Sequence, residues 1–133
     1  MTGLTVFGLI IAHFIGDYWL QSGWMANEKT KRWWPAIVHG VVYTIPFLLV
    51  TQSPLALFVI ASTHIVIDRY RLAKYLAFAK EFIAPKREWP RWDDSKDNYG
   101  FPSKVPTFLS SWLVFIIDNT CHMLINFFAV LLM

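Results

Sequence analysis

Hydrophobic residues gather into four long stretches along this chain, separated by segments that hold most of the charged side chains. The apolar stretches cover residues 3–22, 35–51, 55–69 and 106–132. A helix needs about 20 predominantly apolar residues to cross a bilayer, and fewer where the membrane thins or charged ends reach the interface. The pattern predicts an all-α polytopic membrane protein with four transmembrane helices, and residues 1–133 form a single transmembrane domain.

The third stretch is the shortest, but its helical periodicity continues beyond Arg69. The apolar residues that continue it are Leu72, Tyr75, Leu76, Ala79 and Phe82. This spacing predicts that helix three leaves the bilayer and extends along its surface until Pro85, followed by a loop at about 84–104. Only residues 52–54 separate the second and third stretches, which predicts a tight antiparallel hairpin.

Composition and charge support a membrane location and indicate an orientation. The chain is 56% hydrophobic and 17% aromatic, more than is usual for a soluble domain of this length. All twelve basic residues lie in two connections, residues 29–32 and 69–104. The positive-inside rule places both connections in the cytoplasm, so both termini face outward. Topology and anionic lipid therefore explain the net charge of +3, and no nucleic-acid partner is expected.

Histidine and aspartate are paired four residues apart in three of the apolar stretches, and His39 lies in the remaining one. The pairs are His13 with Asp17, His64 with Asp68, and Asp118 with His122. Ionisable side chains are costly inside a membrane and usually serve a function there. The order is reversed on the fourth helix, which runs the other way, so each Asp lies nearer the cytoplasm and each His about 6 Å deeper. We therefore expect one polar pocket that opens to the cytoplasm.

Imidazole and carboxylate groups together are typical ligands of a divalent metal, with zinc the first candidate and manganese or iron the alternatives. The candidate ligands are His13, Asp17, His39, His64, Asp68, Asp118 and His122. Two arrangements remain open. Either two ions share the ligands with a bridging aspartate, or one ion is held by histidines whose other ring nitrogens donate to the aspartates.

Further residues are candidates for catalysis and substrate contact. An aspartate that does not bind metal, Asp68 or Asp118, could act as a general base. Arg69 and Arg71 follow Asp68 at the cytoplasmic rim and could bind a phosphate or a lipid headgroup, and Gln21 could orient a ligand. Cys121 is the only cysteine, so no internal disulfide can form. Gly16 and Gly40, beside polar positions, would let helix backbones approach closely.

Four segments carry a resemblance to a known family: AHFIGDYWLQSGWMANEKTK, WPAIVHGVVYT, THIVIDRYRL and DNTCHMLIN. In this order they resemble a family of small uncharacterised membrane proteins of phages, prophages and bacteria. Asn119 stands after Asp118 where that family's pattern has Gln. The resemblance implies the bacterial inner membrane as the location and supplies no activity.

These features favour a metal-dependent hydrolase that acts on a lipid or lipid-linked substrate from the cytoplasmic side. Two alternatives stay open. The first is a non-enzymatic small membrane protein that acts through partner binding or homo-oligomerisation, in which the His and Asp residues join the helices. The second is a carrier of cations or protons.

Overall fold

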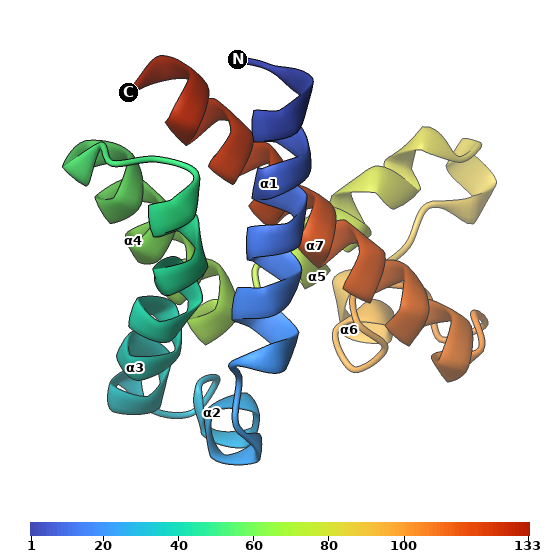
Figure 1. Ribbon diagram of the computed structural model, residues 1–133. Helices are drawn as coiled ribbons and strands as arrows, with labels where there is room; N and C mark the ends of the chain where they lie inside the picture. Colours follow the sequence, from blue (N-terminus) through green and yellow to red (C-terminus); the bar gives the residue numbers. More distant parts are fainter. The chain divides into compact units, whose positions relative to one another are not determined.

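The computed structural model describes residues 1–133 and is helical throughout, without strands (Figure 1). The chain divides into two compact units. Met1–Arg71 and His122–Met133 form the first unit, and Leu72–Cys121 forms the second. The long helix α7 (Thr107–Leu132) contributes residues to both units. The predicted all-α class is therefore confirmed.

The first unit contains the predicted first, second and third helices and the end of the fourth. Its elements are α1 (Gly3–Phe14), η1 (Ile15–Trp19), α2 (Gly23–Glu28), α3 (Trp33–Thr44), η2 (Ile45–Leu49), α4 (Pro54–Tyr70) and the last residues of α7. Four residues, 50–53, connect η2 to α4, and α3 and α4 lie side by side as an antiparallel pair (Figure 1). The predicted hairpin is confirmed.

Local sequence signals set the helix starts. The hydroxyl of Thr2 accepts a hydrogen bond from the amide of Thr5 at 3.2 Å, and the Ser53 hydroxyl accepts one from Ala56 at 3.3 Å. Each satisfies an amide that has no partner within its helix. Pro54 occupies the first turn of α4, where its missing N–H costs nothing.

Close helix packing holds the first unit together. Its apolar core takes residues from every long helix: Leu9, Ala12, Tyr43, Phe47, Ala56, Ile60 and Ala129. A Cβ atom added to Gly40 would lie 2.2 Å from Cγ1 of Ile65 on α4, and one added to Gly16 would lie 2.6 Å from the carbonyl oxygen of Tyr43. Both contacts would be impossible for a larger residue, so the predicted close approach at these two glycines is confirmed.

The end of the first long helix is a π-helical turn, η1. The amide of Leu20 bonds to the carbonyl of Ile15, five residues back, at 3.0 Å. Such turns insert an extra residue into a helix and are frequent at functional sites. Asp17 lies within this turn, and His13 lies in the α-helical turn before it. The two side chains are both buried, but they point to different neighbours.

The predicted continuous extension of helix three is wrong at one position. Arg71 adopts a left-handed conformation with φ 51° and ends α4, and a separate helix, α5 (Ala73–Lys80), carries most of the predicted apolar stripe. The amide of Arg71 bonds to the carbonyl of Asp68 at 3.2 Å, which is the C-terminal cap of α4. Helical periodicity alone cannot reveal a single left-handed residue.

The predicted loop at 84–104 is an ordered part of the second unit. It follows η3 (Glu81–Ile83) and contains η4 (Lys86–Glu88) and α6 (Trp92–Ser95). The buried amide of Asn98 donates to the carbonyls of Pro102 and Val105, and its oxygen accepts a 2.6 Å hydrogen bond from Ser110. The Ser103 amide donates to Asp94, and hydrogen bonds from the Ser103 side chain and then from this amide lower the pKa of that carboxyl below its ordinary value.

By length and composition, α7 alone could cross a membrane among the helices of this chain. The first two long helices, Gly3–Trp19 and Trp33–Leu49, are apolar but shorter. Each of them, like α4 with its 17 residues, would rise roughly 25 Å, against about 30 Å for the hydrocarbon core of a bilayer.

Candidate metal centre

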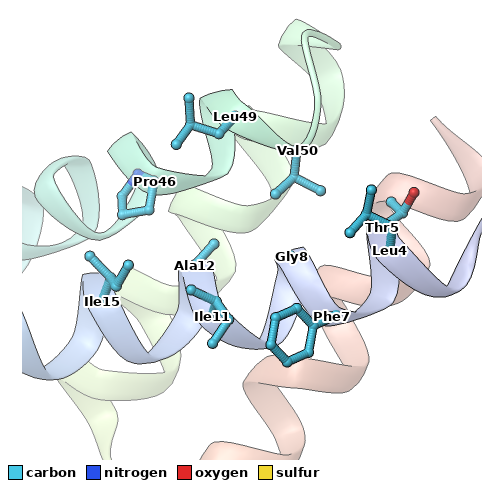
Figure 2. Close-up of a pocket in the computed structure, with 10 residues that line it drawn as sticks. All are labelled: Leu4, Thr5, Phe7, Gly8, Ile11, Ala12, Ile15, Pro46, Leu49 and Val50. Carbon is cyan, nitrogen blue, oxygen red and sulfur yellow. The ribbon is translucent and has the colours of Figure 1, made fainter.

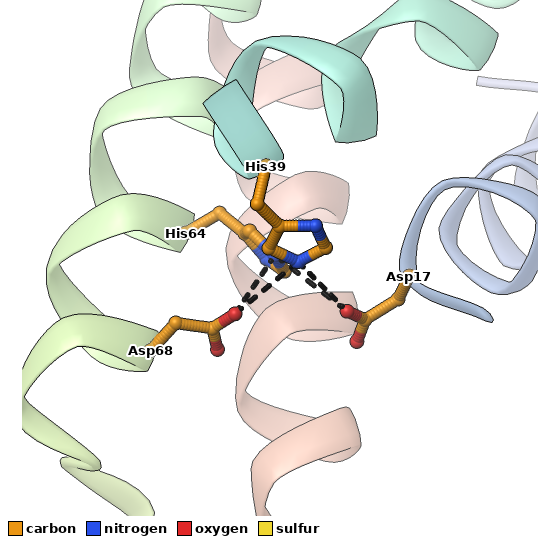
Figure 3. A group of neighbouring side chains, drawn as sticks. All are labelled: Asp17, His39, His64 and Asp68. Carbon is orange, nitrogen blue, oxygen red and sulfur yellow. Dashed lines mark hydrogen bonds and ion pairs between the residues drawn. The ribbon is translucent and has the colours of Figure 1, made fainter. Parts of the chain in front are cut away.

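Four of the seven predicted metal ligands come together in the buried interior of the first unit. Asp17 comes from η1, His39 from α3, and His64 and Asp68 from α4 (Figure 3). Their side chains are only 1% to 6% exposed. One nitrogen or oxygen from each lies within 4.8 Å of all the others, so this cluster could hold a metal ion.

The distances within this group are close to those of a metal coordination sphere. Nε2 of His39 lies 2.9 Å from Nε2 of His64, and both nitrogens lie 3.3 Å from Oδ2 of Asp68. Oδ1 of Asp17 lies 3.2 Å from Nε2 of His39 and 3.7 Å from Nε2 of His64. A tetrahedral ion with bonds of about 2.0 to 2.2 Å separates its ligand atoms by roughly 3.3 to 3.6 Å. Nε2 of His39, Nε2 of His64 and Oδ2 of Asp68 form a nearly regular triangle, and Oδ1 of Asp17 lies beside it.

A further histidine, His122, contacts two residues of this group, His64 and Asp68. Its Nδ1 lies 3.2 Å from Nδ1 of His64, and its Nε2 lies 3.3 Å from Oδ1 of Asp68. If Nε2 of His64 offers its lone pair to a cation, its proton must lie on Nδ1 and is donated to His122. His122 then carries its own proton on Nε2 and donates it to Asp68. This chain satisfies all three side chains and fixes the tautomers that metal binding requires.

Tyr43 contacts two buried histidines, His64 of the cluster and His13 outside it. Its ring stacks on that of His64 with centroids 3.6 Å apart and an interplanar angle of 8°. Its hydroxyl lies 2.9 Å from Nδ1 of His13 and accepts a 2.6 Å hydrogen bond from Asn126. His13 is fully buried, but its hydrogen bond is with the Tyr43 hydroxyl, and it lies outside the group of four donors.

Lys29 is part of this centre, a role that the sequence did not indicate. Its ammonium lies 2.6 Å from Oδ2 of Asp68, 3.2 Å from Nε2 of His39 and 3.7 Å from Oδ1 of Asp17. Nε2 of His39 lies between the Lys29 ammonium, which can only donate, and the Asp17 carboxylate, which can only accept. The other ring nitrogen of His39, Nδ1, is buried and has no hydrogen-bond partner.

The segment after Lys29 is fixed by Arg69, one of the predicted substrate residues. The Arg69 guanidinium donates to the carbonyl of Thr30 at 2.7 Å and to that of Lys31 at 3.2 Å. It also lies over the rings of Trp33 and Tyr70, at 5.5 and 5.6 Å from their centroids. Arg69 therefore ties the connection between α2 and α3 to the end of α4.

The other predicted site residues lie outside the cluster of four donors. Asp118 belongs to the second unit and stands one turn before His122 on α7. Arg71 is exposed at the left-handed end of α4. Gln21 lies between η1 and α2, and its Oε1 is buried without a hydrogen-bond partner.

From the sequence, Lys29 is one of several basic residues that the positive-inside rule places in a cytoplasmic connection. Its basic neighbours differ from it in their partners, because Lys31 and Arg32 both pair with Glu28, at 3.2 and 3.1 Å. The hydrogen bond from Lys31 lowers the pKa of the Glu28 carboxyl. Only the spatial structure distinguishes the buried lysine from its exposed neighbours.

Comparison with known proteins shows a family and no characterised relative. Neither the curated proteins nor the solved structures include a match to this chain. The profile of one family, described as proteins of unknown function (DUF3307), matches residues 5–133, which agrees with the resemblance to an uncharacterised family. The match covers nearly the whole chain, so this protein is a member of the DUF3307 family.

Proposed function

We propose that the protein is an intramembrane metalloenzyme, a zinc-dependent hydrolase of a lipid or lipid-linked substrate. The observation that carries the proposal is the near-regular triangle of His39, His64 and Asp68, with edges of 2.9 to 3.3 Å. Two histidines and one carboxylate are a ligand set typical of catalytic zinc, which keeps its fourth position for water. A metal held in this way supplies an activated water for hydrolysis.

Asp17 has the position of a general base in this proposal. Its Oδ1 lies on the side of the triangle, 3.2 Å from His39 and farther, 3.7 Å, from His64. A carboxylate that lies next to the proposed ligands, but is not itself a ligand, can accept the proton of the attacking water. The π-turn places Asp17 here, since it sets this residue apart from His13 on the same helix.

A membrane location fits the surface of the first unit. Large apolar side chains are exposed on α1, η2 and α4, among them Leu4 at 81%, Leu49 at 93% and Phe58 at 68% exposure. Exposed apolar surface of this extent indicates contact with lipid or with a partner. We infer four spans with helices of 17 to 26 residues, which needs modest bilayer thinning around the three shorter ones. The extension over α5 would then lie at the interface, with the basic connections in the cytoplasm and both termini outside.

An apolar groove on the first unit supports a substrate with an acyl chain. It lies between α1 and η2, has a volume of about 390 Å³, and Thr5 is the one polar side chain in its lining (Figure 2). In the sequence, the part of the lining that comes from the first long helix ends at Ile15, two residues before Asp17. The apolar lining matches the chemistry of an acyl chain.

Elemental analysis of the protein purified in detergent tests the metal. We expect one zinc ion per chain, and none in the His64→Gln variant. Incubation with bacterial lipid extracts then tests catalysis. The wild type should release a product that the Asp17→Asn variant, still loaded with zinc, does not. Equal product from both would show that Asp17 is not the base. If neither released a product, the protein would bind metal without acting as a hydrolase.

The salt bridges of Lys29 favour a second candidate, a structural centre without metal. The ammonium pairs with both Asp17 and Asp68, at 3.7 and 2.6 Å, and so offsets one of their two negative charges without a metal. In that case the His and Asp residues only join the helices, and the protein acts through partners or self-association. Purified protein that contains no transition metal, and stays folded after His64→Gln substitution, would support this candidate.

A further inference from the structure

Lys29 and a metal ion would use the same donor atoms. The ammonium contacts three of the four atoms that could bind the ion, at 2.6 Å (Asp68), 3.2 Å (His39) and 3.7 Å (Asp17). A metal bound to Asp68 and His39 would lie about 2 Å from each of these atoms. The two cations would then be within a few ångströms of each other in a buried site, where repulsion between like charges is strong.

Lys29 also lies on the accessible side of the cluster. Its side chain is 15% exposed, whereas those of Asp17, His39, His64 and Asp68 are 1% to 6% exposed. It belongs to the connection after α2, a helix of six residues with no buried side chain. Of these five side chains, that of Lys29 is therefore the most accessible to solvent.

From these contacts we propose that Lys29 is the gate of the metal site, an internal cation that must leave the donor atoms before a metal can bind. This proposal rests on the proposed function, because it concerns the same site. The lysine side chain has four rotatable carbon bonds, so the ammonium can move without a change in the backbone. Arg69 keeps the backbone next to Lys29 in place through its bonds to Thr30 and Lys31. The displaced ammonium therefore stays at the entrance, where it can bind the anionic part of a substrate.

Two measurements test the gate. The first compares zinc affinity in the wild type and in Lys29→Met, by competition with a chelating indicator. Without the competing cation, we expect zinc to bind at least tenfold more tightly. Lys31→Met is the matched control, because it removes the same charge from an exposed side chain that pairs only with Glu28. Its affinity should stay within about twofold of the wild type, since exposed ion pairs contribute little.

The second measurement needs no substitution, and so stands even if Lys29→Met does not fold. An amine-reactive reagent is applied to the wild type with and without zinc, and the modification of each lysine is read by mass spectrometry. We expect zinc to increase the labelling of Lys29 at least fivefold and to leave Lys31 unchanged.

The outcomes separate the gate from the function it serves. If the wild type binds zinc but neither the labelling of Lys29 nor the affinity in Lys29→Met changes, the gate is wrong and the metal site stands. If neither protein binds any zinc, the proposed function fails and the gate fails with it.

Discussion

The two carboxylate oxygens of Asp68 face different histidines, and this divides the roles of these histidines. Oδ2 faces Nε2 of both His39 and His64 at 3.3 Å, whereas Oδ1 lies 3.3 Å from Nε2 of His122. A ligand whose second oxygen accepts a hydrogen bond is held in one orientation. In the proposed metal site, His122 would therefore position Asp68 and His64, and His64 would bind the ion directly.

This division predicts different losses for two similar substitutions. His64→Gln should abolish zinc binding, because it removes a ligand atom. His122→Gln should keep one ion per chain but weaken its affinity about 10- to 100-fold, the usual effect of losing a group that orients ligands. Titration of the purified variants with zinc gives both numbers. His13→Gln is the control, since His13 bonds to Tyr43 and lies outside the four donors, and should retain full stoichiometry. Complete loss of zinc in His122→Gln would make His122 a ligand instead.

Residue types and helical spacing predicted all four members of the cluster, but they could not separate these four from the other three candidates, His13, Asp118 and His122. A spacing of four residues places two side chains on one face of an α-helix, which correctly brought His64 and Asp68 together. The same rule predicts that His13 and Asp17 share one helix face and one site. In the structure, Asp17 lies in the π-turn at Ile15–Trp19 and contacts His39, whereas His13 contacts Tyr43. Lys29 lies on a connection outside the apolar stretches, so no periodicity relates it to the cluster.

At the scale of helices, the close contact between α3 and α4 sets the distance between His39 and His64. Gly40 follows His39 directly, and its missing Cβ leaves room for Ile65, the residue after His64. The sequence indicated this contact through a small residue beside a polar one. It did not indicate the end of α4. The left-handed position that ends this helix is usually a glycine or an asparagine, and here it is Arg71.

Gly40→Ala should therefore disturb both stability and metal binding. The added methyl group would lie 2.2 Å from Cγ1 of Ile65 and force α3 and α4 apart. Overpacking of this kind costs about 1 to 3 kcal/mol of unfolding free energy, and zinc affinity should fall because the two imidazoles separate. Equilibrium unfolding in mixed detergent micelles measures the first effect, and zinc titration the second. Gly3→Ala is the matched control, since no atom lies within 4 Å of its added Cβ. Equal stability of the two variants would mean that the helices adjust at no cost.

For the whole molecule, the proposed membrane topology would decide which side of the bilayer the candidate metal centre faces. Four spans place both termini on the outer side and the connections that hold Lys29 and Lys96 in the cytoplasm. If α7 alone crossed the bilayer, the termini would lie on opposite sides. The alternatives differ at the N-terminus, because the C-terminus follows α7 in both.

Cysteine labelling in intact bacterial cells separates these topologies. In a Cys121→Ser background, single cysteines at Thr2, Lys31, Lys96 and Met133 would be treated with a membrane-impermeant maleimide. We expect labelling at Thr2 and Met133 in intact cells, and at Lys31 and Lys96 only after the cells are permeabilised, because twelve basic residues hold the two connections on the cytoplasmic side. Protection of Thr2 together with labelling of Met133 would indicate a single span through α7. The cluster of Asp17, His39, His64 and Asp68 would then lie outside the hydrocarbon core, and a substrate within the membrane would no longer follow from its position.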